Sequence, residues 1–234
     1  MKIIVNHLTR MKPGYFCVAG VDLKTRQHVR PVMAHRLRTP LLARYGGIFD
    51  MGAVILLRKT WYVGRPPEIE DHRFDAQRAH RIRDMAPDEF WGLLCEVSDS
   101  SLSNIFGDEL KQGNLVCTVE KGRGLASLGS LYLPTAPQLW LDAYNRIRVY
   151  IDDGTYRAQV GLTDLRFYEP DHQTPRLDVL EHVKQKIASG VPVILSVGLT
   201  RPWQKSRNAL AKHWLQANNI HLQDDPTWQD WPLL

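Results

Sequence analysis

Hydrophobic and polar positions alternate along this chain over short distances, as they do in half-buried β-strands. Most apolar runs are short, rich in β-branched and aromatic residues, and bounded by Gly, Pro, Asn or Asp. The run at 53–61 is more continuously apolar, which predicts a more buried strand. The other predicted strands cover residues 3–5, 15–21, 28–33, 114–120 and 191–197.

The strongest hairpin signal is Asp153-Gly154, a two-residue turn between two alternating arms. Alternate residues from Ile147 to Ile151 are β-branched, and they predict the inward face of the first arm. The outward face then carries cationic and aromatic side chains, namely Arg146, Arg148 and Tyr150 on the first arm and Arg157 on the second.

Helical patterns are fewer. Residues 75–84 contain neither Gly nor Pro, and they open a predicted helical region at about 75–98. A second helix is predicted at about 175–189, because an apolar stripe there is followed by Gly190, a residue that suits a helix end.

Short strands in twos and threes, interrupted by a helical segment in each half, favour Greek-key barrels over βαβ units. We therefore predict a mainly β fold with a few helices (α+β), built from two OB-like Greek-key barrels packed together. The glycine-rich stretch 121–129 is the predicted linker or long mobile loop. The predicted domains are residues 1–122, with a helical insertion at about 75–98, and residues 123–234, with the helix at about 175–189.

Composition narrows the class of protein. Hydrophobic residues make up 44% of the 234, enough for a core, yet no run approaches the roughly 20 apolar residues of a membrane helix. The N-terminus lacks the apolar segment of a secretory signal, and the three cysteines are far apart and form no CxxC pair. We therefore expect a cytoplasmic, reduced protein without a membrane partner.

The net charge of +5 conceals a strong asymmetry. Residues 1–66 carry twelve Lys and Arg against two acids, so this segment is +10. Residues 67–234 carry 18 bases and 23 acids, so the remainder is −5. A positive face of this kind attracts polyanions through counterion release and long-range steering. A solvated face without a partner has the same composition.

Two arginines, Arg30 and Arg201, precede prolines, which hold the preceding residue in extended geometry. Each would project from a strand end, where its planar guanidinium suits phosphate binding. The alternative is that each pairs with a structural acid. Arg36 and Arg38 lie with Arg30 in a stretch free of acids, residues 28–40, which favours a basic rim that contacts phosphates.

Aromatic residues near the cations point to contacts with nucleobases. The outward hairpin face, with Arg148, Tyr150 and Arg157, matches a stacking platform for single-stranded nucleic acid, although an ordinary solvated sheet face looks the same. Trp203 and Trp214 are further stacking candidates, although most tryptophans belong to a core.

No catalytic motif is evident: a nucleophile elbow, a P-loop and a dinucleotide fingerprint are all absent. We therefore favour a protein without catalytic residues, metal or cofactor. Residues 209–223 fit either a hairpin that turns at Asn218-Asn219 or, in their first part, a helix. In the hairpin, His213 and His221 lie on opposite arms, which leaves a metal site open as an alternative.

Motifs at both ends of the chain resemble one known family. KPGYFCVAG at 12–20, followed by a strand that ends in VRPV at 29–32, is similar to the start of the dual-OB domain of prokaryotes. SVGLTRPW at 196–203 and HWLQANNIHL at 213–222 resemble the C-terminal part of that domain. The resemblance implies two OB folds that act as a nucleic-acid-binding or sensing module in genome neighbourhoods linked to defence, and it brings no catalytic set.

We therefore predict a module that binds single-stranded or structured RNA or DNA, as a sensor or accessory component of a prokaryotic defence system. Three alternatives stay open: a nucleotide or small-molecule sensor, a metal-dependent nuclease, and a scaffold whose basic face docks an acidic partner protein. The sensor would hold its ligand between the barrels with Arg201, Trp203 and His213, and the nuclease would use His213, His221 and Asp224. The predicted nucleic-acid contacts are Arg30, Arg36, Arg38, Arg148, Tyr150, Arg157, Arg201, Trp203 and Trp214.

Overall fold

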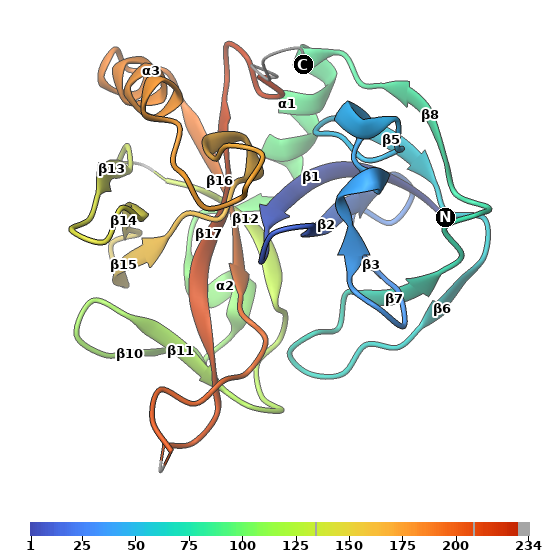
Figure 1. Cartoon of the computed structure of the whole chain (residues 1–234). Helices are drawn as coiled ribbons and strands as arrows, with labels where there is room; N and C mark the ends of the chain where they lie inside the picture. The colour runs from blue at the N-terminus through green and yellow to red at the C-terminus, as the bar shows by residue number, and fades with distance from the viewer. Residues whose placement is uncertain (134, 208, 229–234) are drawn as a thin grey trace.

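The computed structural model of the chain describes residues 1–133, 135–207 and 209–228. Strands dominate it, and its described residues contain three α-helices: α1 (Pro87–Glu96), α2 (Leu102–Phe106) and α3 (Leu177–Ala188) (Figure 1). Two sheets each curl into a half-barrel. The predicted mainly β fold with a few helices is therefore confirmed.

The first sheet is built from the N-terminal strands in the order β6-β7-β3-β2-β1-β5-β8, with β4 paired to β2. The pairing of β3 with β7 is parallel, and the other pairs in this sheet are antiparallel. The strands β6 and β8 are therefore the two edges. The elements are β1 (Lys2–Arg10), β2 (Tyr15–Asp22), β3 (His28–Val32), β4 (Leu37–Arg38), the 3-10 turns Thr39–Leu41 and Ala43–Tyr45, β5 (Ala53–Leu56), β6 (Thr60–Tyr62), β7 (Asp71–Phe74) and β8 (His80–Asp84).

The second sheet has the order β10-β11-β17-β16-β12-β9, and a separate three-stranded sheet has the order β13-β14-β15. The three-stranded sheet and α3 lie on the side of the second sheet away from the first (Figure 1). The elements are β9 (Ser98–Asp99), β10 (Lys111–Gln112), β11 (Cys117–Glu120), β12 (Leu128–Tyr132), β13 (Gln138–Leu141), β14 (Ile147–Asp152), β15 (Arg157–Gly161), the 3-10 turn η3 (Leu165–Phe167), β16 (Val193–Leu199) and β17 (Lys212–Leu222).

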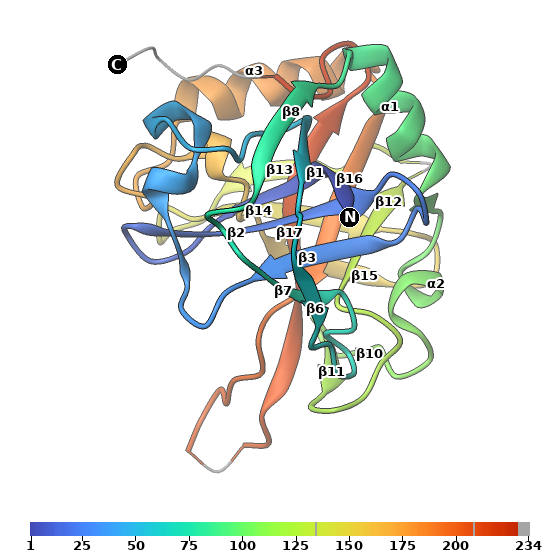
Figure 2. The same ribbon diagram turned by 90° about the vertical axis from the view of Figure 1, so that its right-hand side faces the viewer.

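The two halves pack face to face along β1. Seen from the side of the first sheet, the strands of that sheet lie in front of β16 and β17 (Figure 2). Residues 3–9 of β1 are all buried, because the core of the first sheet covers one face of the strand and the second sheet covers the other. Polar residues are therefore enclosed at this seam, among them Asn6 and His7.

The predicted hairpin and the second predicted helix are both present. Alternate residues from Ile147 to Ile151 in β14 are buried, as are Ala158 and Val160 across the turn. The helix predicted at about 175–189 is α3, which inserts Val183 and its neighbours into the second core. In both elements the periodicity of apolar residues alone specified the buried face.

The helix predicted for residues 75–84 is wrong. Residues 80–84 instead form the edge strand β8, which pairs antiparallel with β5. The absence of Gly and Pro is compatible with either structure, and Ile82 points outward with 45% of its surface exposed. The long-range pairing with β5 decides between them, as tertiary context often overrides a weak local preference. The stretch that opens at Pro87 is helical, as predicted.

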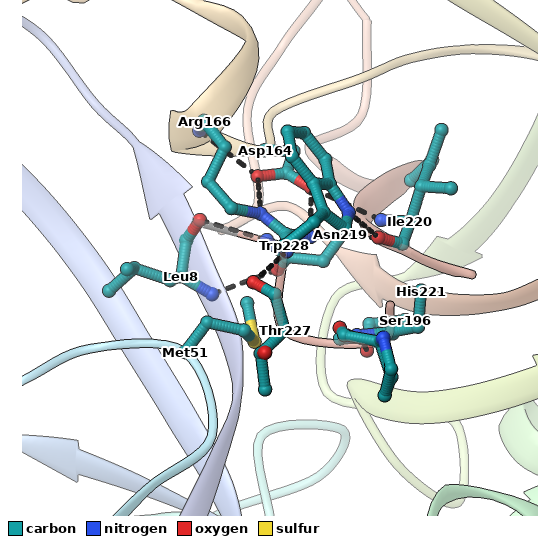
Figure 3. Close-up of polar contacts among 12 residues, drawn as sticks. Leu8, Met51, Asp164, Arg166, Ser196, Asn219, Ile220, His221, Thr227 and Trp228 are labelled. Carbon is teal, nitrogen blue, oxygen red and sulfur yellow. Dashed lines mark hydrogen bonds and ion pairs between the residues drawn. The ribbon is translucent and has the colours of Figure 1, made fainter. Parts of the chain in front are cut away.

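The hairpin or helix predicted for residues 209–223 is also wrong, because β17 runs without a turn from Lys212 to Leu222. Asn218 and Asn219 lie inside the strand, where its register against β16 shifts. The amide of Asn219 accepts a hydrogen bond from the Leu8 amide at 2.8 Å and donates one to the Leu8 carbonyl at 3.1 Å (Figure 3). Asn219 thus serves as a hydrogen-bonding partner for β1, not as a turn residue.

The chain passes from the first sheet to the second earlier than the predicted domain boundary. Strands β9, β10 and β11 precede residue 122 and belong to the second sheet. The stretch 121–129 ends inside β12, and Ser127 is fully buried. Its amide and hydroxyl each donate to the Glu70 carboxylate at 2.8 Å, and this contact anchors the end of the loop to the first half. The division into two folding units stays a prediction.

The short turn η3 connects the two cores. Leu165 belongs to the core of the first sheet, and Phe167 belongs to that of the second. Between them Arg166 bonds Asp164 through Nε at 2.9 Å and through a terminal nitrogen at 2.7 Å, and both side chains are essentially inaccessible (Figure 3). Arg166 also donates to the carbonyls of Ile220 and Thr227. The ion pair is therefore saturated with partners, as a buried pair must be to remain charged.

Removing the acid from this pair should destabilise the whole protein. Asp164→Ala leaves the Arg166 guanidinium buried and uncompensated, which typically costs about 3–5 kcal/mol. The free energy of unfolding in urea should fall by this amount. The exposed ion pair of Arg26 with Glu96 is the control, because Glu96→Ala should change stability by less than about 1 kcal/mol.

Buried histidines make the seam sensitive to acid. Burial lowers the pKa of His221 to about 4, with a further contribution from Arg166, and burial likewise lowers the pKa of His28 to about 4. The His221 ring is held between the Ser196 hydroxyl at 3.0 Å and the Pro226 carbonyl at 3.1 Å. These histidines are therefore neutral in the folded protein at pH 7.

Acidification should unfold the protein progressively between pH 6.5 and 4. In this range the unfolded chain takes up protons at its histidines and the folded chain does not, so stability is present above pH 6.5 and falls with pH. His221 alone should account for about 2 kcal/mol between pH 7.5 and 5. Urea midpoints at the two pH values test this, and His221→Gln should flatten the dependence; an unchanged slope would contradict it.

Candidate nucleic-acid interface

One edge of the first sheet is a two-stranded ribbon in which β6 pairs antiparallel with β7. Trp61 lies opposite Arg73, and Tyr62 lies opposite His72. Successive side chains of a strand point to opposite faces, so the first pair lies on one face of the ribbon and the second pair on the other. We call these the Trp61 face and the Tyr62 face.

The Trp61 face is aromatic and cationic. Trp61 is 46% exposed, and the ammonium group of Lys59 lies 5.0 Å from its ring centroid. Arg73 is exposed opposite the indole, and Arg58 and Arg65 are exposed at the two ends of β6. No acid separates these residues of the 58–65 segment. An accessible ring among cations is the combination by which proteins stack bases and hold the phosphates of single strands.

Asp71 of β7 receives one arginine from each half of the protein. Arg30 donates its Nε to Oδ1 at 2.5 Å, and Arg201 donates a terminal nitrogen to Oδ2 at 2.7 Å. Arg201 also lies 3.2 Å from a carboxylate oxygen of Glu68. The two Arg-Pro arginines therefore meet at one carboxylate, although 171 positions separate them in the sequence (201 − 30).

The two arginines differ in accessibility. Arg30 is only 5% exposed, so it cannot reach a phosphate at the surface and serves as a structural partner of Asp71. The prediction that Arg30 contacts phosphate does not fit this position, and its alternative, a pair with a structural acid, does. The side chain of Arg201 is 56% exposed and keeps one face open beside the ribbon.

Arg201 lies at the start of an arm between β16 and β17, whose described residues 200–207 and 209–211 project from the body of the protein (Figure 1). Trp203 is 48% exposed and stacks on Trp214, with centroids 5.2 Å apart and planes inclined by 28°. Lys205 and Arg207 are exposed further out, and the arm contains no acid. The stacked indoles thus form an aromatic platform in a cationic segment.

The remaining rim arginines are accessible. Arg36 and Arg38 are both exposed, and within the described part of the chain neither forms an ion pair. Arg38 belongs to β4 and lies opposite Tyr15 of β2. Their predicted contact with phosphate is compatible with these positions and stays a prediction.

The hairpin face predicted as a stacking platform lies elsewhere. Arg148 is half-buried and donates to the Gln159 carbonyl at 2.7 Å, and burial lowers its pKa. Arg157 is exposed but pairs with Asp152 at 3.0 Å, and Tyr150 is half-buried between β13 and β15. These residues belong to the three-stranded sheet, on the far side of the second sheet from the ribbon (Figure 1). The structure therefore does not join them to the basic rim.

The alternative metal site does not assemble. His213 and His221 lie on one continuous strand eight residues apart, which places them about 26 Å from each other at the rise of a β-strand. His213 bonds the Thr200 carbonyl at 2.9 Å, and Asp224 pairs with Lys186. Two histidines at this separation cannot ligate one ion. No cluster of three metal-ligating side chains occurs among the residues that the structure describes.

Sequence reasoning missed the ribbon. Residues 58–65, RKTWYVGR, directly follow the apolar run AVILL, and the strand predicted at 53–61 includes only the first four of them as its tail. The switch from apolar residues to paired cations and aromatics was the available signal. The pairing of Glu68 and Asp71 with the Arg-Pro arginines could not be predicted either, because nothing local in the sequence relates residue 71 to residues 30 and 201.

Two curled half-barrels with an exposed aromatic and basic edge define a double OB-type protein. The chain belongs to the dual OB-containing domain family, whose family model matches residues 1–220. No curated protein and no solved structure matches it. None of the helices in the described ranges has the length and apolar character needed to cross a membrane.

The two Arg-Pro arginines should separate by their effect on stability. Arg30→Ala leaves Asp71 partly uncompensated in a buried site and should lower the free energy of unfolding by about 3 kcal/mol or more. Arg201→Ala removes a half-exposed partner and should cost less than about 1 kcal/mol. Urea denaturation of both variants tests the assignment. Equal losses would show that Arg201 is as structural as Arg30.

Proposed function

We propose that this protein binds single-stranded nucleic acid on the Trp61 face of the ribbon together with the arm. The observation that carries the proposal is the accessible indole of Trp61, flanked by Lys59 and lying opposite Arg73. A base can stack on the indole while adjacent phosphates contact the cations. Membership of the dual OB-containing domain family supports the proposal, since OB folds commonly bind oligonucleotides.

The arm extends this surface. Arg201 touches Asp71 and Glu68 next to the ribbon, so the arm leaves the protein body beside the Trp61 face. Trp203 of the arm and Trp214 of β17 stack into a second platform, and Lys205 and Arg207 add positive charge further out. Arg36 and Arg38 would supply more distant phosphate contacts. RNA, DNA and a role in defence are finer assignments that rest on the family resemblance alone.

Neutralisation of the local acids explains why the surface stays positive. Glu68 and Asp71 are both engaged by Arg201, and Asp71 is engaged by Arg30 as well. Asp75, the acid that follows β7, lies 3.5 Å from the guanidinium of Arg78. The remaining cations of the ribbon and arm are therefore free to attract phosphates. Such attraction weakens steeply with salt, because binding releases condensed counterions.

Ribbon variants should weaken nucleic-acid binding in two distinguishable ways. Trp61→Ala removes a stacking platform, which typically contributes about 1–3 kcal/mol per base. Lys59→Ala and Arg73→Ala should each reduce the slope of log affinity against log salt by about 1. Fluorescence anisotropy of labelled single-stranded RNA, single-stranded DNA and duplex over a salt series measures both effects.

The hairpin face provides the matched control. Arg146→Ala and Arg157→Ala also remove exposed arginines, but from the far side of the second sheet, and should leave affinity and salt slope unchanged. Loss of binding in these variants with retention in the ribbon variants would move the interface to the hairpin. No binding of any oligonucleotide at low salt would refute the proposed function.

A further inference from the structure

A cavity of about 600 Å³ opens on the Tyr62 face of the ribbon, within the size range of ligand pockets. Tyr62 and His72 line it from the ribbon, and His28 lines it from β3. Asp99 of β9 and Asn104 of α2 line it from the opposite side. The cavity therefore lies between the two halves of the protein, with the ribbon as one wall.

The acids of this cavity differ in their availability. Asp22 accepts the amides of its own turn, Glu70 accepts hydrogen bonds from Ser127 and Leu128, and Glu96 pairs with Arg26. Asp99 is half-buried in the lining, and its carboxylate accepts no hydrogen bond from any residue in the described ranges. Asp99 is thus the acid of the cavity that remains available to a ligand.

The lining also carries apolar residues, among them Ile69, Ile105 and Leu128, and two cationic groups, the N-terminal amine of Met1 and the Arg26 guanidinium, which pairs with Glu96. His28 turns its Nε2 inward toward the amide of Asn6 at 3.4 Å and the hydroxyl of Ser130 at 3.5 Å. Burial keeps its ring neutral, because the pKa is lowered to about 4. The oxygen of the fully buried Asn6 side chain has no partner among the described residues. The ring edge of His72 meets Tyr62 at a centroid distance of 5.3 Å.

This chemistry excludes phosphate and favours a base. The four carboxylates around the cavity outnumber its two cationic groups, which disfavours an anion, whereas the opposite face of the ribbon is cationic. β6 is an edge strand of only three residues. A nucleic acid bound on the Trp61 face can therefore pass around this short edge and reach the cavity on the other face. Phosphates can then stay on the basic face while one base turns over the edge. Tyr62, 61% exposed at the mouth, offers a ring for stacking.

We propose that the cavity receives one nucleobase of the bound strand, and that Asp99 selects bases with an exocyclic amino group. The inference rests on the proposed function, since the Trp61 face delivers the strand. Cytosine presents its N4 amino group as a donor, which a carboxylate accepts, whereas thymine presents the O4 oxygen at the same position. A carboxylate facing O4 is repelled and left without a partner. Cytosine is therefore preferred over thymine.

The test compares labelled oligo-dC and oligo-dT of equal length by fluorescence anisotropy at pH 8. Comparing two pyrimidines keeps stacking similar, so the amino group is the main difference. The unmodified protein should bind oligo-dC about tenfold more tightly or better, the range of one base-specific contact. Asp99→Ala should remove this preference. Asp108→Ala, which removes an exposed acid outside the cavity, should retain it.

A second variant covers the case in which Asp99→Ala does not fold. Asp99→Asn keeps the shape of the side chain and can donate to O4 as well as accept from N4, so it should also bring the two affinities together. Equal affinity of the unmodified protein for both oligonucleotides would overturn the base pocket and leave the proposed function standing. A preference that survives both Asp99 variants would overturn the role of Asp99. Failure to bind these two oligonucleotides would overturn this inference, and failure to bind the RNA and duplex probes as well would overturn the proposed function.

Discussion

The buried ion pair of Asp164 with Arg166 is the interaction on which the arrangement of the two halves depends. It lies in a turn whose Leu165 enters one core and whose Phe167 enters the other. Arg166 also bonds two carbonyls, and the indole of Trp228 lies 3.9 Å from its guanidinium carbon. A buried pair of this kind adds little net stability over apolar packing, but it tolerates few alternative geometries. Its structural consequence is a fixed junction between the two cores.

The seam between β1 and β17 extends this control of geometry. Asn219 pairs with both backbone groups of Leu8, and Asn218 contacts the ring of His7 at 3.0 Å. These hydrogen bonds can form at only one register of the two strands. An apolar seam could shift its register by two residues with a smaller loss of stability. The seam thus sets how β1 and β17 lie against each other. The ribbon belongs to the sheet of β1, and the arm extends directly from β17.

Features that depend on local periodicity could be predicted from the sequence. The buried face of β14 and the apolar stripe of α3 follow from alternation and helical spacing, and both proved correct. The error at residues 80–84 arose because an edge strand with one partner, β5, carries no clear period of its own. The error at Asn218-Asn219 arose because the residue pair is common in turns, while here its amides serve a strand 211 positions away.

The candidate interface was harder to predict, for a related reason. The basic rim predicted from charge stays a prediction, and the two arginines singled out by their prolines converge on Asp71, a contact that no local pattern reveals. Arg30 became structural because it meets that acid inside the sheet, and Arg201 stayed accessible because it meets it from the arm. The same residue type in the same dipeptide therefore has two different roles. Burial, which only the tertiary fold determines, distinguishes them.

The ribbon presents two faces of different chemistry on one short edge element. Alternation along β6 sends Trp61 to a cationic face and Tyr62 to an acid-lined cavity, although the two residues are adjacent in sequence. A strand of three residues is too short to hide either face, and its outer edge has no neighbouring strand. Under the proposed function, surfaces of opposite polarity across one edge would hold backbone phosphates on one side and a base on the other, because the two groups differ in charge. This arrangement would require the cavity wall contributed by the second half to stay in place. The seam between β1 and β17 holds that wall against the first half.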